Sequence, residues 1–117
     1  MPFFKKGSVD RNEMFPGFYL TSFANEALGA VSLSANSVEV KPNSGIELHV
    51  HPEHEEAILV LEGTIEFVLG PETIIGEEGD VLIVPASIVH SMHNKKNNDC
   101  KLVTVFPTTD PQRIFVE

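Results

Sequence analysis

Short apolar runs separated by turn residues are the feature of this sequence that most limits its fold. The runs are rich in Val, Ile, Leu, Phe and Thr, clusters of Gly, Pro, Asn or Asp interrupt them, and no segment keeps a helical period over three turns. This spacing predicts an all-β protein whose antiparallel strands form a closed barrel or a two-sheet jelly roll, because both forms limit exposed strand edges. The strands are expected near residues 27–33, 37–41, 46–51, 57–62, 64–69, 73–75, 81–84, 88–93, 101–106 and 113–116.

The length and composition of the chain indicate a single domain. It has 117 residues, of which 42% are hydrophobic and 21% are charged, as is usual for one globular unit. Cys100 is the only cysteine, so no internal disulfide can form, and no apolar run has the length of a membrane span or the order of a signal peptide. We therefore expect a soluble cytoplasmic protein.

The charge of the chain limits its partners. Acidic residues outnumber basic residues by 17 to 8, and the net charge of -9 opposes binding to nucleic acids and to anionic membranes. No Lys or Arg occurs in residues 42–94, although phosphorylated ligands usually need such side chains. A small neutral or monocarboxylate ligand is therefore favoured, unless a basic residue reaches in from another strand. The candidates for that are Arg11, Lys41, Lys101 and Arg113.

The histidines are grouped in a way that suggests a metal site. All five lie within residues 49–93, and His49 and His51 have the spacing that puts two side chains on one face of a strand. Glu56 opens the next expected strand, and a hairpin-like return would bring its carboxylate beside them. His90, on a later strand, would complete the set in a closed barrel. Three imidazoles and one carboxylate suit one divalent ion such as Fe, Mn, Ni, Zn, Co or Cu, with positions left for water or substrate.

The two histidine clusters resemble the paired motifs of the cupin superfamily. The first motif is matched by Gly45, His49-Val50-His51, Glu56 and Gly63, and the second by Gly79, Pro85, Ser87, His90 and Asn94. Two departures concern turns: the interval from Gly45 to His49 is shorter than the common form, and Ser87 stands where a Gly is usual.

The resemblance implies the fold and the ligand set of that family. It implies an antiparallel double-stranded β-helix, the jelly-roll barrel, over about residues 25–107. We read residues 1–24 as an N-terminal arm, in which 18–23 could form an edge strand. It also implies that the metal ligands are His49, His51, Glu56 and His90.

The remaining polar residues of the motifs have less direct roles. His54 could replace His51 as a ligand if the loop has a different register, although its position after Pro52 favours a solvated loop residue. His93 lies three positions after His90, so it faces the opposite way in a strand. Asn94 is expected to fix the following turn and not to contact the metal.

The apolar alternates on the motif strands divide into two sets. The inward set either lines a cavity around the metal or packs as barrel core: Ile58, Val60, Phe67, Met92 and Phe106, with Ile83 and Ile88. The outward set is also apolar and predicts a homodimer interface: Leu59, Leu61, Val103 and Val105.

Three functions agree with these features. The first is a metal-dependent enzyme, dioxygenase-like or an isomerase or decarboxylase, acting on a small neutral or carboxylate metabolite. The second is a non-catalytic, metal-dependent binding or sensor domain, and the third is a metal-free jelly roll. Groups for proton transfer are few, since Tyr19 is the only tyrosine. The scarcity of such groups argues against an isomerase or a lyase, which need proton transfer, more than against an oxygenase, in which the metal does most of the activation.

Overall fold

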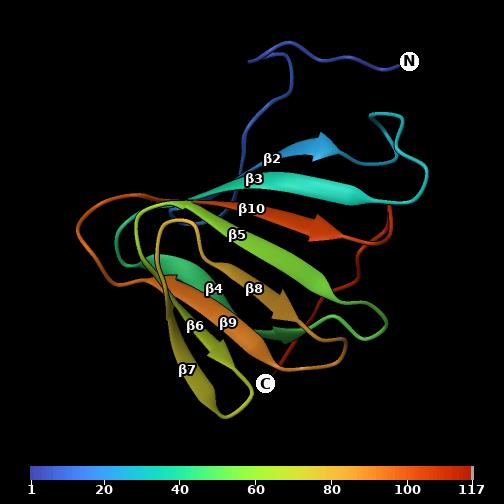
Figure 1. Ribbon diagram of the computed structural model, residues 1–117. Helices are drawn as coiled ribbons and strands as arrows, with labels where there is room; N and C mark the ends of the chain where they lie inside the picture. The colour runs from blue at the N-terminus through green and yellow to red at the C-terminus, as the bar shows by residue number, and fades with distance from the viewer. Residues whose placement is uncertain (117) are drawn as a thin grey trace.

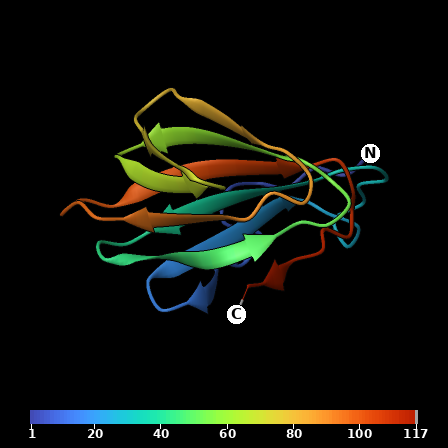
Figure 2. The same ribbon diagram turned by 90° about the horizontal axis from the view of Figure 1, so that it is seen from below.

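The computed structural model describes residues 1–116, which form two antiparallel β-sheets and no helix. The six-stranded sheet has the order β1-β2-β3-β10-β5-β8, and the five-stranded sheet has the order β11-β4-β9-β6-β7 (Figures 1 and 2). The strands are β1 (Asn12–Phe15), β2 (Phe18–Ala24), β3 (Ser34–Val40), β4 (Ser44–Val50), β5 (Glu56–Glu62), β6 (Ile65–Leu69), β7 (Glu72–Gly76), β8 (Val81–Val84), β9 (His90–Asn94), β10 (Cys100–Phe106) and β11 (Ile114–Phe115). Within this part of the chain, no helix is long and apolar enough to cross a membrane. The all-β jelly roll predicted from the sequence is confirmed.

The core lies between the two sheets and follows from alternating side chains. Leu102 of β10 is opposite Val38 of β3 on one side and Val60 of β5 on the other, and all three side chains are almost completely buried. From the other sheet, Ile65 and Phe67 of β6 join the same cluster. Removing these apolar side chains from water is the main force that holds the sheets together.

The N-terminal residues contribute more to the sheet than the sequence suggested. Strands β1 and β2 lie within residues 1–24, the range expected to be an arm. In β2, Phe18 pairs with Val40 of β3 and is buried in the core, and Leu20 packs against the same cluster. The burial of Phe18 explains why β2 continues the sheet beyond β3.

The prediction of a strand over residues 27–33 is wrong. Residues 25–30 form turns, in which the Asn25 side chain accepts a hydrogen bond from the Leu28 amide at 2.9 Å and the Asn25 carbonyl accepts one from the Ala30 amide at 2.9 Å. Gly29 has φ of 96°, a left-handed conformation that favours glycine. Local polar contacts therefore outweigh the apolar character of this run.

A β-bulge sets the direction of His49 on β4. The pairing of β4 with β9 runs through Ile46 and Met92 and then shifts, so that His49 is opposite His90. Glu47 and Leu48 are consequently both exposed, whereas Ile46 and His49 on either side of them are both buried. One extra residue in β4 changes the phase of the alternation and turns His49 inward. The bulge lies in the interval that is shorter than the common motif.

Candidate metal centre

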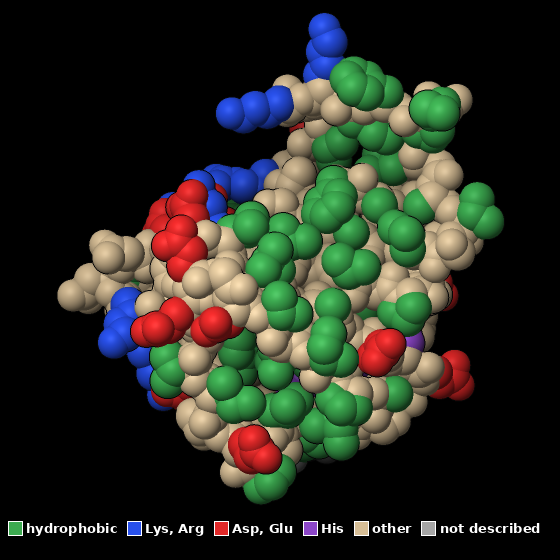
Figure 3. All heavy atoms as spheres, viewed as in Figure 1, with side chains coloured by type: hydrophobic (Ala, Val, Ile, Leu, Met, Phe, Trp, Pro, Cys, Tyr) green, Lys and Arg blue, Asp and Glu red, His purple; other side chains and the backbone are tan. Residues whose placement is uncertain are grey.

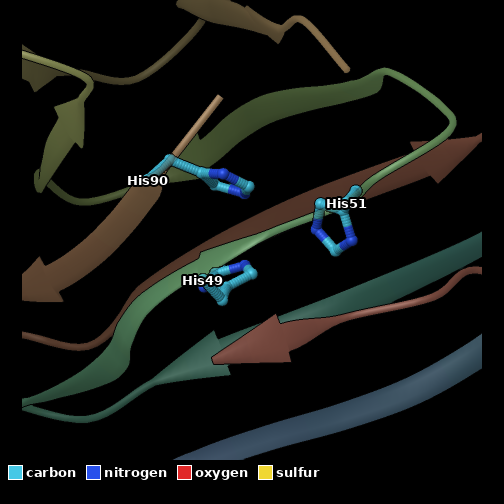
Figure 4. A group of neighbouring side chains, drawn as sticks. All are labelled: His49, His51 and His90. Atoms are coloured by element: carbon cyan, nitrogen blue, oxygen red, sulfur yellow. The ribbon is translucent and has the colours of Figure 1, made fainter. Parts of the chain in front are cut away.

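Three buried histidines from two strands converge between the sheets. His49 lies near the end of β4, His51 follows that strand directly, and His90 begins β9. Each offers one nitrogen atom, and these atoms all lie within 4.8 Å of one another. Figure 4 shows the three imidazole rings around a common space. Such a group could hold a metal ion.

The carboxylate of Glu56 joins this cluster. Glu56 begins β5, its side chain is buried, and its Oε1 lies 3.4 Å from Nε2 of His51 and 3.3 Å from Nε2 of His90. The structure therefore brings together all four residues that the sequence singled out as ligands. Glu56 follows His51 after a short loop between β4 and β5, whereas His90 comes from the much later strand β9 and meets them only in the folded protein.

Backbone carbonyls determine which nitrogen of each imidazole faces the centre. The Nδ1 atoms of His49, His51 and His90 lie 2.7, 2.6 and 2.9 Å from the carbonyl oxygens of Glu47, Gln112 and Ile88, respectively. A carbonyl oxygen can only accept, so each Nδ1 carries the proton and donates it. The lone pair of each neutral ring is then on Nε2, the state in which histidine binds metals, and the carbonyls fix the ring orientations.

The atoms that face the centre lack other partners. Nε2 of His51, Nε2 of His90 and Oε1 of Glu56 are buried and make no hydrogen bond to any described residue. Leaving a buried polar atom unpaired costs about 1–3 kcal/mol. All three atoms are acceptors in the tautomers above, so they repel one another unless a cation lies between them. The donor set fits a divalent metal ion.

Burial and neighbouring groups set the charges of the cluster. Burial lowers the pKa of His49 to about 4, against a smaller opposing effect of the Glu47 carbonyl, so His49 is neutral at neutral pH. Burial alone would raise the pKa of Glu56, but hydrogen bonds and positive charge from His51 and His90 would hold that pKa below its ordinary value. Only rings protonated on Nε2 can do this, and with Nε2 unprotonated a bound cation would take that role. A neutral imidazole and an ionised carboxylate are the forms that coordinate a metal.

The turn before His90 supports the histidine strand. Ser87, which stands where the motif usually has Gly, adopts φ of 66°, in the left-handed region. Its amide donates to the His51 carbonyl at 2.9 Å and its hydroxyl donates to the Pro52 carbonyl at 2.7 Å. These bonds offset the strain of a non-glycine residue at positive φ, so the departure leaves the turn intact.

Asn94 fixes the turn after β9, as expected. Its side chain is completely buried, and Nδ2 donates to the carbonyls of Val40 at 3.0 Å and Asn98 at 2.7 Å. Its Oδ1 accepts from the Lys96 amide at 3.0 Å. The residue therefore ties the β9–β10 connection to β3 and takes no part in the histidine cluster.

The other two histidines lie outside the group of three. The ring of His54 stacks on His51 with centroids 5.2 Å apart, and its Nε2 accepts from the Gln112 amide at 3.2 Å. His93 contacts Glu47 on the surface at 3.2 Å, which agrees with the outward direction expected for it. In this structure His51, and not His54, occupies the cluster.

Two adjoining cavities lie beside the cluster. The smaller one, of about 50 Å³, is bordered by His49, His51 and Glu56, and the larger and more open one, of about 420 Å³, is bordered by His51. Both are lined by Phe106, and the smaller also by Met92, two of the expected pocket residues. No local motif marked the other residues that line the larger cavity as a set: Leu20, Asn36, Pro111, Arg113 and Phe115.

The other expected inward residues have different positions. Ile58, Val60 and Phe67 belong to the packed core. The inward direction expected for Ile83 and Ile88 is wrong, because both side chains are exposed. In β8 the alternation buries Val84 and so turns Ile83 outward, and Ile88 lies in the turn before β9.

The fold and the cluster define a small jelly-roll domain with a three-histidine, one-carboxylate centre. The family model of the cupin domain matches residues 36–106, more than half of the chain. The chain belongs to the cupin family.

Its relatives agree with this assignment. The chain is 28% identical to germin-like protein 5-1 of Oryza sativa subsp. japonica over 107 residues, covering 86% of this chain and 46% of that protein. It spans less than half the length of the germin-like proteins that it matches.

Two solved structures share the fold. The oxalate decarboxylase of Lactobacillus farciminis, in a formate complex, superposes with a TM-score of 0.83 at 23% identity, over 92% of this chain and 33% of that one. A sugar phosphate isomerase of the cupin superfamily from Silicibacter pomeroyi superposes with a TM-score of 0.84 at 20% identity, over 99% of this chain and 82% of that one. At this identity the likeness establishes the fold alone.

Proposed function

We propose that this cupin binds one divalent metal ion through Nε2 of His49, His51 and His90 and the carboxylate of Glu56, and that it is a metal-dependent, dioxygenase-like enzyme for a small neutral or carboxylate metabolite. One observation carries the proposal: buried acceptor atoms of His51, His90 and Glu56 face one another without hydrogen-bond partners among the described residues. The metal would be Fe, Mn, Ni, Zn, Co or Cu.

The protein side of the chemistry consists of holding and shielding. A bound ion of this kind supplies Lewis-acid activation and, for a redox metal, electrons for oxygen chemistry. The carbonyls of Glu47, Gln112 and Ile88 keep the imidazoles in the coordinating tautomer. Apolar side chains such as Met92 and Phe106 border the adjoining cavity and limit water around the reacting groups.

Three of the four basic side chains that could have reached the cavity are paired elsewhere, which favours a small neutral or monocarboxylate ligand over a phosphorylated one held by several cations. Arg11 pairs with Glu39, Lys41 with Glu39 and Asp99, and Lys101 with Glu62. Of the four basic residues that could have reached the cavity, only Arg113 lines it.

A non-catalytic binding or sensor domain is the second candidate. The small cavity beside the cluster contains no titratable side chain other than the proposed ligands and Arg113, so it lacks an obvious general acid or base. The only tyrosine, Tyr19, does not line this cavity and stacks instead against Arg11, with the guanidinium carbon 4.2 Å from the ring centroid.

We place either function in the cytoplasm, because the single free thiol of Cys100 is typical of a reducing compartment.

Metal content is the test of the proposed centre. Protein purified without chelator would be analysed by elemental mass spectrometry, together with His90→Ala and the control His93→Ala, which removes a surface histidine from the same strand. We expect about one ion per chain in the wild type and the control and none in His90→Ala. A wild-type protein that takes up no metal on reconstitution, or a His90→Ala variant that keeps it, would overturn the centre.

Oxygen consumption separates the two candidate functions. The metal-loaded protein would be given a panel of small carboxylates and neutral metabolites in an oxygen-electrode assay, with His90→Ala as the control. Metal-dependent consumption with any of them supports the enzyme. Ligand-induced thermal stabilisation without turnover would favour the binding domain.

We also propose that a second copy of the chain covers the outer face of β10, β5 and β8. Figure 3 shows hydrophobic side chains gathered over the middle of this face. Val81, Ile83, Leu61 and Val105 are 60%, 52%, 42% and 38% exposed, and they point away from the core on adjacent strands. A contiguous apolar surface of this kind marks an interaction site, and an isologous dimer buries it on both partners.

The oligomeric state tests this interface. Light scattering on an eluting sample should give twice the mass of the 12.9 kDa chain. Ile83→Glu should give the monomer mass because the charge would lie within the interface, whereas Ile75→Glu, at a similarly exposed position on β7, should stay dimeric. A monomeric wild type, or an Ile83→Glu dimer, would refute the interface.

A further inference from the structure

The segment that contains Arg113 is fastened to the histidine strand at two points. Just before it, the Gln112 carbonyl accepts a hydrogen bond from His51 Nδ1 at 2.6 Å. Just after it, Phe115 of β11 pairs with His49 of β4. His51 and His49 thus hold the segment on either side of Arg113, which places Arg113 beside the proposed metal centre. This segment, residues 107–116, lies outside the region matched by the cupin family model.

The guanidinium of Arg113 is held in position but has no acidic partner in the described part of the chain. It lies 5.5 Å from the ring centroid of Phe15 and 5.3 Å from that of Phe115. No ion pair joins it to a carboxylate among residues 1–116, whereas the other basic residues near this sheet, Arg11 and Lys41, are paired. A guanidinium stacked on aromatic rings keeps its hydrogen-bond donors available for a planar anion.

The surroundings of Arg113 remove it partly from water. Although its side chain remains among the exposed ones, burial lowers the pKa of Arg113, and the negative charge of Glu56 opposes that effect. Arginine stays charged under all ordinary conditions. A positive group is thus present at the border between the cavity and solvent, close enough to Glu56 for their charges to interact.

The larger cavity connects this charge to the histidine cluster. It has a volume of about 420 Å³ and shares Arg113, His51, Asn36 and Phe106 with the small cavity that reaches His49 and Glu56. One wall is apolar, formed in part by Leu20 and Phe115. A single small molecule can therefore contact Arg113 at one end and the cluster at the other.

We propose that Arg113 forms a carboxylate-binding site beside the metal centre, and that the ligand is a small organic acid with an apolar or aromatic body lying along the cavity. The fork of the guanidinium matches the two oxygens of a carboxylate and forms paired, charge-assisted hydrogen bonds. The opposite end of the ligand would face the histidines, and that half of the assignment rests on the proposed function. The carboxylate half does not depend on the metal.

Binding of an acid and of its amide tests the site. Benzoate and benzamide have the same body and differ in charge, and their binding to the metal-free full chain would be measured by calorimetry. We expect the wild type to bind benzoate more tightly than benzamide. Arg113→Gln should weaken benzoate binding about ten- to hundredfold, because a hydrogen-bonded charged pair is lost, and should leave benzamide unchanged. Arg113→Lys, which keeps the charge without the fork, should fall between.

Controls and outcomes separate this site from the metal centre. Arg11→Gln removes another arginine that stacks on an aromatic ring, and it should change neither ligand's affinity. The proposal is overturned if benzoate does not bind, if benzamide binds equally well, or if Arg113→Gln, with a circular dichroism spectrum like that of the wild type, binds benzoate normally. Arginine-dependent benzoate binding in a protein that takes up no metal would overturn the proposed function and leave the carboxylate site standing.

Discussion

Replacing Gly45 by Ala should disturb both the stability of the fold and the metal centre. Gly45 is opposite His93 in the pairing of β4 with β9, the two strands that carry His49 and His90. A Cβ at this position would overlap the carbonyl oxygen of Met92 and lie 2.6 Å from Cδ2 and 2.8 Å from Cα of His93. Because two of these three atoms are backbone, a rotamer change cannot relieve the overlap and the strands must separate.

The size of the effect follows from that separation. Overpacking costs about 1–3 kcal/mol, and the loss of one or two strand hydrogen bonds adds about 0.5–1.5 kcal/mol each. We expect Gly45→Ala to lower the free energy of unfolding by about 2–4 kcal/mol, which for a chain of this length lowers the melting temperature by about 8–16 °C. Metal affinity should fall as well, since His49 and His90 can no longer keep their spacing.

Urea unfolding followed by circular dichroism, with a metal titration of each protein, checks this prediction. Gly79→Ala is the matched control, because a Cβ there meets nothing within 4 Å and only the φ of 91° opposes it. That change should cost about 1 kcal/mol, the usual penalty for a left-handed non-glycine residue, and leave metal affinity unaltered. A Gly45→Ala protein as stable as Gly79→Ala, with normal metal binding, would refute the steric reasoning.

Two further predictions concern buried polar groups. Asn94→Ala removes three buried or partly buried hydrogen bonds, to Val40, Asn98 and Lys96, so the free energy of unfolding measured in urea should fall by about 2–4 kcal/mol; a change below about 0.5 kcal/mol would contradict this role. Burial raises the pKa of the Cys100 thiol to about 11, so a thiol reagent at pH 8 should modify it only after unfolding, and immediate labelling of the native protein would be the contrary result. The unfolded thiol loses its proton first, so the contribution of Cys100 to stability should be complete below pH 9 and lost as the pH rises to about 11.

The sequence alone predicted those structural features that depend on a local pattern of residues. The alternation of apolar residues predicted β5, β6, β8 and β10 close to their observed positions, because a strand with one buried face repeats every two residues. The same period placed His49 and His51 on one face, and the motif spacing selected Glu56 and His90 as their neighbours. The role of Asn94 in its turn was also a local property.

The tertiary structure decided everything that depends on contacts between distant segments. Strands β1 and β2 join the sheet because Phe18 meets a core built by later strands, whereas the apolar run at 27–33 finds no partner and forms turns. The bulge in β4 that turns His49 inward arises from its register with β9. The carbonyl of Gln112 that orients His51, and the position of Arg113 beside the centre, come from β11 folding back onto β4 across more than sixty residues of chain. The sequence alone therefore determined which residues could form the centre. The packing of distant strands determined how those residues are oriented and placed the side chain of Arg113 beside them.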